Sequence, residues 1–254
     1  SGSMSNKLRI TLLTLHYSHQ SSWNMIQKPW NGFCARPTFI SKYETTDVRG
    51  PGNEGMGTKN TKQWGWFVGP IYDTEGKNIL KDENQNDAIV RPEVESLDAA
   101  NWGDGARLLK YEVDKEGKYD YCENDFVLVR YADVLYMKEE AILRGGSGVS
   151  GVNTADFQKI RKRAFAYDVD GGPSKVYTPA TLTLDEILNE RGREFAWENI
   201  RRRDLIRFGK FSTIQYVEGT ESFRKWFPIP YSVIEKSVRD ENGNPIWTQN
   251  EGYN

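Results

Sequence analysis

A change in composition and apolar periodicity at residue 126 constrains the fold more than any other feature of this sequence. Residues 126–212 carry apolar side chains at helical spacing, whereas residues 5–125 are rich in Gly, Asn, Asp and Trp and lack that period. Residues 213–254 are mixed, with several turn signals, and belong to the same domain as the helical block. Residues 1–4 are interpreted as an expression-tag remnant and the start of the chain. The pattern predicts a mainly α-helical fold with short β-strands and long loops.

Helix signals divide the block into predicted segments 126–144, 154–165, one that starts at Thr183, and 200–208. The expected buried stripe of the first segment is Leu128, Tyr131, Ala132, Leu135 and Ile142. The second is expected to bury Phe157, Ile160 and Ala164. Gly145-Gly146 lies between these two segments and predicts an αα-hairpin. A capping box opens the third segment at Thr183, and its apolar face continues through Ile187, Leu188 and Phe195.

Strand signals in the loop-rich part are short. The segments 8–13 and 64–68 are predicted strands, and 81–87 is a predicted polar turn. Residues 107–113 and 119–121 flank a Lys-Glu-Gly-Lys turn and are expected to form a hairpin. No strand is long enough to dominate the fold.

Composition excludes several classes of protein. The formal net charge is -2, which lacks the basic surface that nucleic-acid binding requires. Aromatic residues make up 13% of the chain, and a disordered chain would have few. No apolar run approaches the roughly 18 residues of a membrane-spanning helix.

The densest charge pattern surrounds Glu190, Glu194 and Glu198, which share one helix face. Three nearby arginines are the expected bidentate partners, namely Arg191, Arg201 and Arg207. One interpretation is a carboxylate pair for acid–base chemistry, or an anion site. The interpretation that we favour is a structural ion-pair network that locks two helices together.

Five tryptophans of the loop-rich region are the candidate ligand-binding residues: Trp23, Trp30, Trp64, Trp66 and Trp102. Flat exposed rings suit the apolar faces of sugars, and neighbouring Asn, Asp and Arg side chains can hydrogen-bond to hydroxyl groups. Each single ring has core packing as its alternative role. We expect that at least one of the five contributes to a site.

Metal, cofactor and nucleophile signals are weak. Asp82, Asn84, Asn86 and Glu93 match positions of a calcium loop, but Asp87 replaces the required Gly. The two histidines, His16 and His19, lack further metal ligands nearby in sequence. Cys34 and Cys122 could be thiols or one disulfide bond. We therefore expect no metal site, no cofactor and no catalytic residue.

Motifs spread along the chain resemble those of one known family. In the second half they occupy residues 126–135, 140–141, 160–164, 185–198, 201, 204–207, 209–210, 227–230 and 249–253. Upstream they occupy residues 31–32, 42–43 and 47–49. In this order they resemble the SusD/RagB family of outer-membrane nutrient-binding lipoproteins. The resemblance covers nearly the whole chain but only the C-terminal half of a usual family member.

The resemblance implies the C-terminal part of the SusD-like α-superhelical fold, which contains tetratricopeptide-like helix pairs. It implies non-catalytic binding of oligosaccharide or polysaccharide at the cell surface. The partner that it implies is a SusC-like TonB-dependent transporter of the outer membrane, with membrane attachment only through a lipid anchor outside these residues. The family's hallmark motifs are architectural, so no binding residue is carried over from it.

Two other functions stay open from the residues themselves. A glycoside hydrolase would use two of the three glutamates 190, 194 and 198, whose Cβ atoms lie about 5–6 Å apart on adjacent helical turns. The other is a protein- or peptide-interaction module of an outer-membrane complex, which would bind a protein partner and no sugar.

Overall fold

The computed structural model describes residues 17, 20, 28–51, 65–73, 75–96, 98–110, 127–148, 155–165, 177–212 and 221–253. Contacts divide the chain into two compact units, Ser1–Asn199 and Ile200–Asn254, and each is described by itself. The domain boundaries expected after residues 125 and 212 stay a prediction. The predicted strand 8–13 lies outside the described residues.

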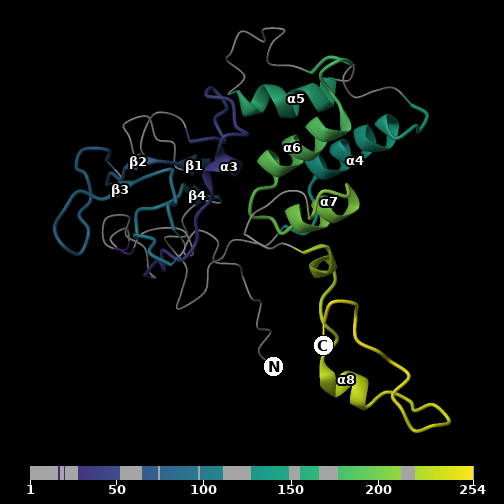
Figure 1. Ribbon diagram of the computed structural model, residues 1–254. Coiled ribbons are helices and arrows are strands. Elements are labelled where there is room, and N and C mark those ends of the chain that lie inside the picture. Colours follow the sequence, from purple (N-terminus) through teal and green to yellow (C-terminus); the bar gives the residue numbers. More distant parts are fainter. Residues whose placement is uncertain are drawn as a thin grey trace, which may run out of the picture. The chain divides into compact units, whose positions relative to one another are not determined.

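The first unit combines short strands with three longer helices. Its elements in chain order are α3 (Pro37–Ile40), β1 (Gly65–Phe67), β2 (Gly69–Pro70), β3 (Ile89–Val90), β4 (Arg107–Leu109), α4 (Tyr131–Leu143), α5 (Ala155–Ala164) and α6 (Leu184–Glu194). The described elements confirm a mainly helical fold with short strands and long loops (Figure 1).

Two small antiparallel sheets organise the loop-rich part. β1 pairs with β4, with Trp66 opposite Leu108, and β2 pairs with β3. β1 confirms the strand predicted within 64–68, and the bridge between Lys81 and Asp87 confirms the predicted polar turn. β4 pairs with a strand about forty residues upstream, while the hairpin partner expected at 119–121 lies outside the described residues.

The core of the loop-rich part surrounds Trp66. This ring is 2% exposed, and its indole N–H donates to the Tyr43 hydroxyl at 2.9 Å. The Tyr43 hydroxyl donates in turn to the carbonyl oxygen of Arg193 on α6 at 3.0 Å. Other buried members of the cluster are Ala35, Ile40, Ala106, Leu108 and Ala196. The hydrogen bonds and the shared cluster tie the strands to the helices.

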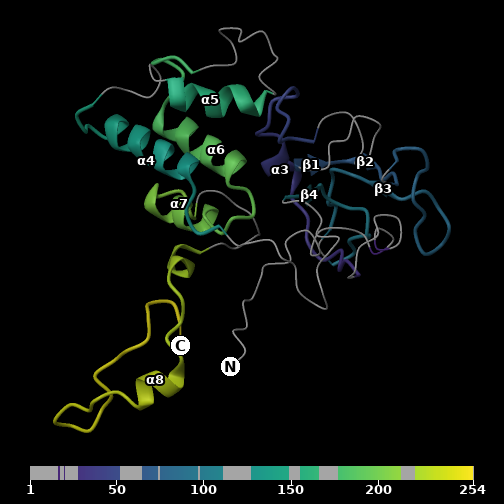
Figure 2. The same cartoon turned by 180° about the vertical axis from the view of Figure 1, so that it is seen from behind.

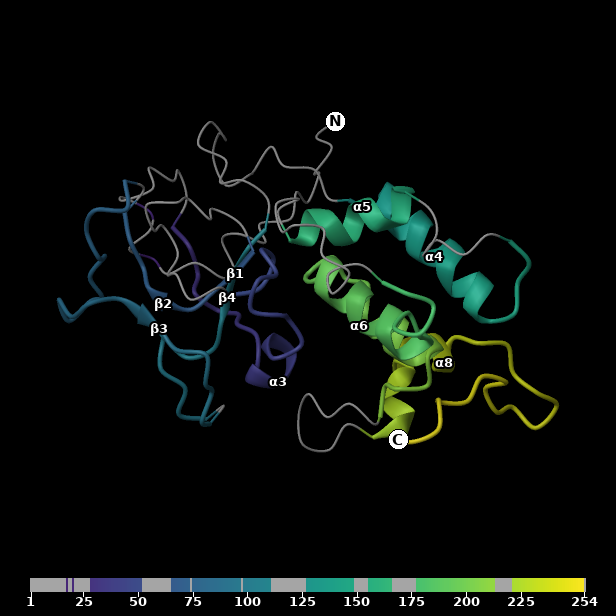
Figure 3. The same cartoon turned by 90° about the horizontal axis from the view of Figure 1, so that it is seen from above.

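The helices α4, α5 and α6 form the second part of the same unit. α4 packs against both α5 and α6, and Figure 1, Figure 2 and Figure 3 show these helices side by side. As predicted, α5 buries Phe157, Ile160 and Ala164. The Tyr136 ring of α4 contacts the rings of Phe157 and Phe195 edge-on, with centroids 5.6 and 5.7 Å apart. Aromatic contacts therefore fill the space between the helices.

The predicted buried stripe of α4 is wrong at its first two positions, while Ala132 is buried as predicted and Leu135 and Ile142 are half-buried. The helix starts at Tyr131, and Leu128 and Tyr131 are 79% and 65% exposed. The buried positions of α4 are Ala132, Asp133, Tyr136, Glu139 and Glu140. The acidic groups can be buried because cations accompany them: Arg191 pairs with Asp133 at 2.6 Å. Ion pairing across the interface, rather than apolar spacing, selects which face of α4 is buried.

α6 begins where its sequence predicts. The Thr183 hydroxyl accepts a hydrogen bond from the Glu186 backbone N–H at 3.1 Å, which confirms the N-cap. Ile187, Leu188 and Phe195 are buried, as predicted. After the helix, Trp197 and Asn199 adopt positive φ angles of 65° and 59°, a region that non-glycine residues rarely enter.

The second unit contains α7 (Arg201–Arg207), the 3-10 helix η2 (Ser222–Lys225) and α8 (Tyr231–Glu235). Side-chain amides hold the proline-containing segment of residues 226–230. The Gln249 amide accepts from the Ile229 N–H and donates to the Ile229 carbonyl, both at 2.8 Å. Asn250 donates to the Phe227 carbonyl at 2.7 Å. These bonds replace the backbone partners that a proline-containing segment lacks.

Candidate functional site

The five candidate tryptophans occupy different environments. Trp30 is 60% exposed and Trp102 is half-buried, so both offer ring surface to a ligand. Trp66 is a core residue that is 2% exposed, and it lines the cavity described below; its part in ligand binding stays a prediction. Trp23 and Trp64 lie outside the described residues.

A hydrogen bond connects the two chain segments that carry the accessible rings. Asn31, which follows Trp30, donates from its side chain to the Trp102 carbonyl oxygen at 3.1 Å. Asn31 has a φ angle of 51°, so the chain turns sharply beside the ring. We call the residues Trp30, Asn31 and Trp102 the aromatic surface. An exposed ring beside an amide is the combination that stacks on a sugar and hydrogen-bonds to its hydroxyl groups.

Arg107 of β4 donates hydrogen bonds to two residues of the aromatic surface. The side chain is buried, and it donates to the carbonyl oxygens of Asp104 at 2.9 Å and of Gly105 at 3.2 Å. It also donates to the Asn31 side-chain oxygen at 3.2 Å and to the Trp102 carbonyl. Burial lowers the pKa of Arg107. This residue was not among the predicted site residues, and its position in a short strand carries no local signal of the role.

Rings form a continuous series from the surface to the core. Phe33, which is 50% exposed, contacts Trp197 edge-on with centroids 5.5 Å apart. Trp197 contacts Trp66 at 6.5 Å, and Trp66 contacts Phe39 at 6.0 Å. Sequence reasoning missed Phe33 and Trp197 because they lie more than 160 residues apart, and only the fold brings them together.

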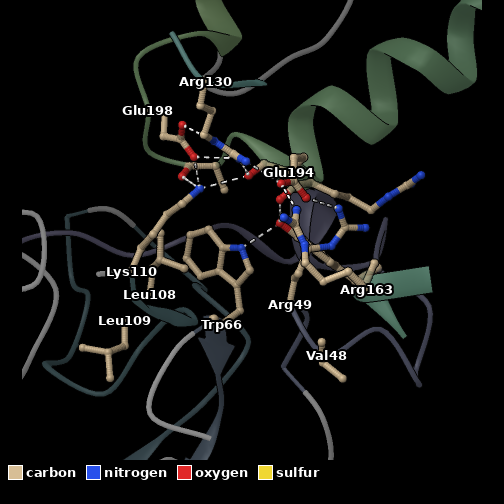
Figure 4. A pocket seen from close by; sticks show the side chains of 15 residues that line it. Val48, Arg49, Trp66, Leu108, Leu109, Lys110, Arg130, Arg163, Glu194 and Glu198 are labelled. Atoms are coloured by element: carbon tan, nitrogen blue, oxygen red, sulfur yellow. Dashed lines mark hydrogen bonds and ion pairs between the residues drawn. The ribbon is translucent and has the colours of Figure 1, made fainter. Parts of the chain in front are cut away.

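A cavity of about 550 Å³ lies between the strands and the helices of the first unit. Figure 4 shows Val48, Trp66, Leu108 and Leu109 on one side of it and a group of charged side chains on the other. The charged residues that line the cavity are Arg49, Lys110, Arg130, Arg163, Arg193, Glu194 and Glu198. The cavity therefore has an apolar wall and an ionic wall.

The ionic wall is centred on Glu194. One carboxylate oxygen of Glu194 pairs with Arg130 at 2.7 Å and with Arg163, and the other pairs with Arg49 at 2.8 Å. Burial raises the pKa of Glu194, but the three guanidinium groups oppose it and bring the pKa down to about 2. The carboxylate is held in its charged form.

Glu198 and Lys110 extend the wall. Arg130 binds Glu198 through Nε at 3.0 Å, and the Lys110 ammonium pairs with the same carboxylate (Figure 4). Lys110 also donates to the carbonyl oxygens of Glu194 and Ala196 at 2.9 and 3.0 Å. All three donor positions of this ammonium group therefore have a partner, and burial lowers its pKa.

Glu190 lies deeper, one helical turn before Glu194. It accepts from Arg49 at 2.9 Å, from Arg193 at 2.6 Å and from the Tyr177 hydroxyl at 3.1 Å. Burial raises the pKa of Glu190, but Arg49, Arg193 and Arg161 outweigh burial and hold it well below its usual range. Tyr136 of α4 and Arg161 of α5 also bind it, so its partners come from widely separated segments of the chain.

The preferred interpretation of the glutamate cluster, a structural ion-pair network, is confirmed. The ion pairs found for two of its expected partners are with other carboxylates, and the part expected for Arg201 stays a prediction. Arg191 pairs with Asp133, and Arg207 pairs with Asp204 on its own helix. Residues next to each other on a helix point to different faces, so apart from Arg193, which lies one turn from Glu190, distant segments supply the cations that reach Glu190 and Glu194.

Within the described residues, no group of three or more His, Cys, Asp or Glu side chains is arranged to hold a metal ion. The Asp82 carboxylate instead accepts the backbone N–H groups of Asn84 and Asn86 at 2.8 and 2.9 Å, which closes its turn. Cys34 is a free thiol, and Cys122 lies outside the described residues. No described helix is both long and apolar enough to cross a membrane.

Comparison with known proteins first defines the fold. The chain is similar to the solved structure of surface glycan-binding protein A from Bacteroides thetaiotaomicron, with a TM-score of 0.56 and 19% sequence identity. The likeness covers 95% of this chain and 46% of that protein. It supports a SusD-like fold with the mainly helical architecture described above.

Sequence comparison then defines the family. The family model described as the SusD family matches residues 13–222. The chain is also 32% identical over 178 residues to the starch-binding protein SusD of Bacteroides thetaiotaomicron. That alignment covers 64% of this chain and 29% of the relative. The chain belongs to the SusD family, and it spans less than half the length of both relatives.

Proposed function

We propose that this protein binds oligosaccharide or polysaccharide without cleaving it. The binding takes place at the cell surface, on the outer membrane, to which a lipid anchor attaches the protein. A SusC-like TonB-dependent transporter receives the bound glycan.

Family membership is the observation that carries this proposal. The SusD family model matches residues 13–222, and the relative at 32% identity is named a starch-binding protein. The structural neighbour is named a surface glycan-binding protein. These names concern the longer relatives, and their extension to this chain, its transporter and its location is our proposal.

The aromatic surface supports sugar binding in this part of the molecule. The exposed Trp30 ring and the half-buried Trp102 ring lie on segments that Asn31 and Arg107 hold together. A sugar ring stacks its C–H face on an aromatic ring, and amide groups nearby bind its hydroxyl groups. Because Arg107 fixes the loop, little conformational entropy is lost when the ligand binds.

The ion-pair network supports binding without catalysis. A glycosidase needs one carboxylic acid whose pKa is raised so that it can protonate the leaving group. The pKa values of Glu190 and Glu194 are lowered instead, and arginines occupy both carboxylates. The glycoside hydrolase alternative therefore lacks a general acid among these two glutamates.

Calorimetry with a panel of soluble oligosaccharides tests the proposal. Trp30→Ala and Trp102→Ala should each weaken binding about tenfold, because an aromatic–ligand contact of this kind contributes about 1–2 kcal/mol. Trp247→Ala is the matched control, since Trp247 is a tryptophan of the second unit that is 51% exposed. It should leave the affinity unchanged.

Two results would contradict the proposal. One is a panel in which no oligosaccharide binds. The other is turnover of a chromogenic glycoside that Glu194→Gln abolishes, which would assign the cavity carboxylates to catalysis. A protein-interaction module would give a third pattern, in which Trp30→Ala breaks co-purification with a transporter and leaves sugar binding intact.

A further inference from the structure

The charges of the cavity are distributed unevenly. Five cationic side chains and two carboxylates line it. The other carboxylates of the network, which include Asp47 and Glu190, pair with Arg49 and Arg193 from behind and do not line the cavity. The network as a whole is compensated, but the side that faces the cavity carries an excess of positive charge. Such a field attracts an anionic ligand.

Arg163 is the cation with the weakest compensation. Its counter-ion in the described part of the chain is Glu194, which Arg49 and Arg130 already share. By contrast, Arg49 also pairs with Asp47 and Glu190, and Arg130 also pairs with Glu198.

Arg163 is also the most accessible of these cations. Its side chain is 47% exposed, against 26% for Arg130, 21% for Lys110 and 11% for Arg49. One terminal nitrogen binds Glu194, and the remaining N–H groups of the planar guanidinium can bind a carboxylate. The edge of the cavity therefore presents an arginine that a ligand can reach.

The opposite wall determines what else the ligand must offer. Val48, Leu108 and Leu109 are apolar, and the Trp66 ring lies beside them (Figure 4). A volume of about 550 Å³ is within the range of small-molecule sites and far exceeds that of an inorganic anion. A sugar ring has an apolar C–H face that suits such a wall. A ligand that combines this face with a carboxylate would contact both walls at once.

We propose that this cavity is a subsite for an acidic sugar, in which a uronic acid residue places its carboxylate on Arg163 and its ring against the apolar wall on the side of Val48 and Leu108. The inference rests on the proposed function, because it assumes that the ligand is a carbohydrate. It adds the chemical class of the sugar and a second place of contact, apart from the aromatic surface.

Binding of matched probes to the whole protein tests the subsite. The probes are trigalacturonate, the neutral maltotriose and the acidic peptide triglutamate, each measured by calorimetry. Arg163→Gln should weaken the binding of trigalacturonate about tenfold, because one charge-assisted bidentate contact is lost. Lys162→Gln is the control, since it removes the same charge from an exposed neighbour on α5 that does not line the cavity.

Two further measurements separate the subsite from a general charge effect. Raising the NaCl concentration from 50 to 500 mM should weaken trigalacturonate binding and leave maltotriose binding unchanged. The melting temperature of Arg163→Gln should stay close to that of the unsubstituted protein, because Glu194 retains Arg49 and Arg130.

The outcomes are distinct. If maltotriose binds and trigalacturonate does not, the subsite is wrong and the glycan-binding function stands. The same conclusion holds if Arg163→Gln and Lys162→Gln bind trigalacturonate equally well. If triglutamate binds with the same dependence on Arg163 as trigalacturonate, the ligand class is wrong. If neither sugar binds, both the subsite and the proposed function fail.

Discussion

Two sites in the first unit bury cations in opposite ways. Arg193, near the C-terminal end of α6, binds the Glu190 carboxylate at 2.6 Å. Arg107, in β4, binds the backbone carbonyls of Asp104 and Gly105. Burial lowers the pKa of both guanidinium groups, but Glu190 reverses the effect for Arg193 and its pKa rises.

The difference shows what each site can do. Carboxylates of the helical site compensate charge with charge, so removing one partner leaves a buried ion without its counter-ion. At the other site, the dipoles of backbone carbonyl groups compensate the positive charge of Arg107. Those carbonyl oxygens belong to the loop that carries Trp102. The first site stabilises the fold, whereas the second positions a surface.

The largest expected effect in this comparison comes from Glu190→Gln. We expect the free energy of unfolding to fall by about 3–5 kcal/mol, because Arg49, Arg193 and Arg161 lose a shared buried counter-ion. Urea unfolding followed by circular dichroism measures it. A loss below about 1 kcal/mol would contradict the view that this network stabilises the helices.

The second largest expected effect is a loss of unfolding free energy at acid pH, caused by Glu194 of the helical site. The folded-state pKa of Glu194 is about 2, below its ordinary value of 4.5, so its contribution is complete above pH 4.5 and is lost as the pH falls towards 2. The expected loss for this group between pH 7 and pH 3 is about 2 kcal/mol. Urea unfolding at several pH values measures the slope, and Glu194→Gln should reduce it. An equal slope in the variant would assign the acid sensitivity to other groups.

The smallest expected effect distinguishes the two arginine sites directly. Arg107→Lys keeps the charge but loses the planar set of donors, and we expect it to cost about 1–2 kcal/mol of unfolding free energy. It should also weaken sugar binding at Trp102, because the loop loses its anchor. Arg91→Gln is the control, since Arg91 is a half-exposed partner of Asp104 in the same loop. An unchanged affinity in Arg107→Lys would separate Arg107 from the aromatic surface.

Several local features could be predicted from the sequence. The N-cap at Thr183, the buried face of α5 and the turn at 81–87 were predicted and are confirmed. Each depends on residues within a few positions of one another, where backbone geometry and apolar spacing decide the outcome. The ordered motifs also indicated the family, which the SusD family match confirms.

Features that depend on distant partners were missed. The predicted stripe of α4 did not include the buried Asp133, because burial of this carboxylate depends on Arg191 on another helix. Apart from Arg193, the ion-pair partners of Glu190 and Glu194 lie far away in the chain, at residues 49 and 130 and on α5. Trp66 could not be distinguished from Trp30 by its sequence neighbours, although one is buried and the other exposed.

The sequence by itself determined α5, the start of α6 with its N-cap, and the family, because these depend on local spacing and on motifs that stay in order along the chain. Tertiary structure decided which carboxylates share which arginines, which tryptophans remain accessible, and where the cavity lies. The physical reason is that burial and ion pairing depend on distances between side chains, and only the folded chain sets those distances across a hundred residues or more.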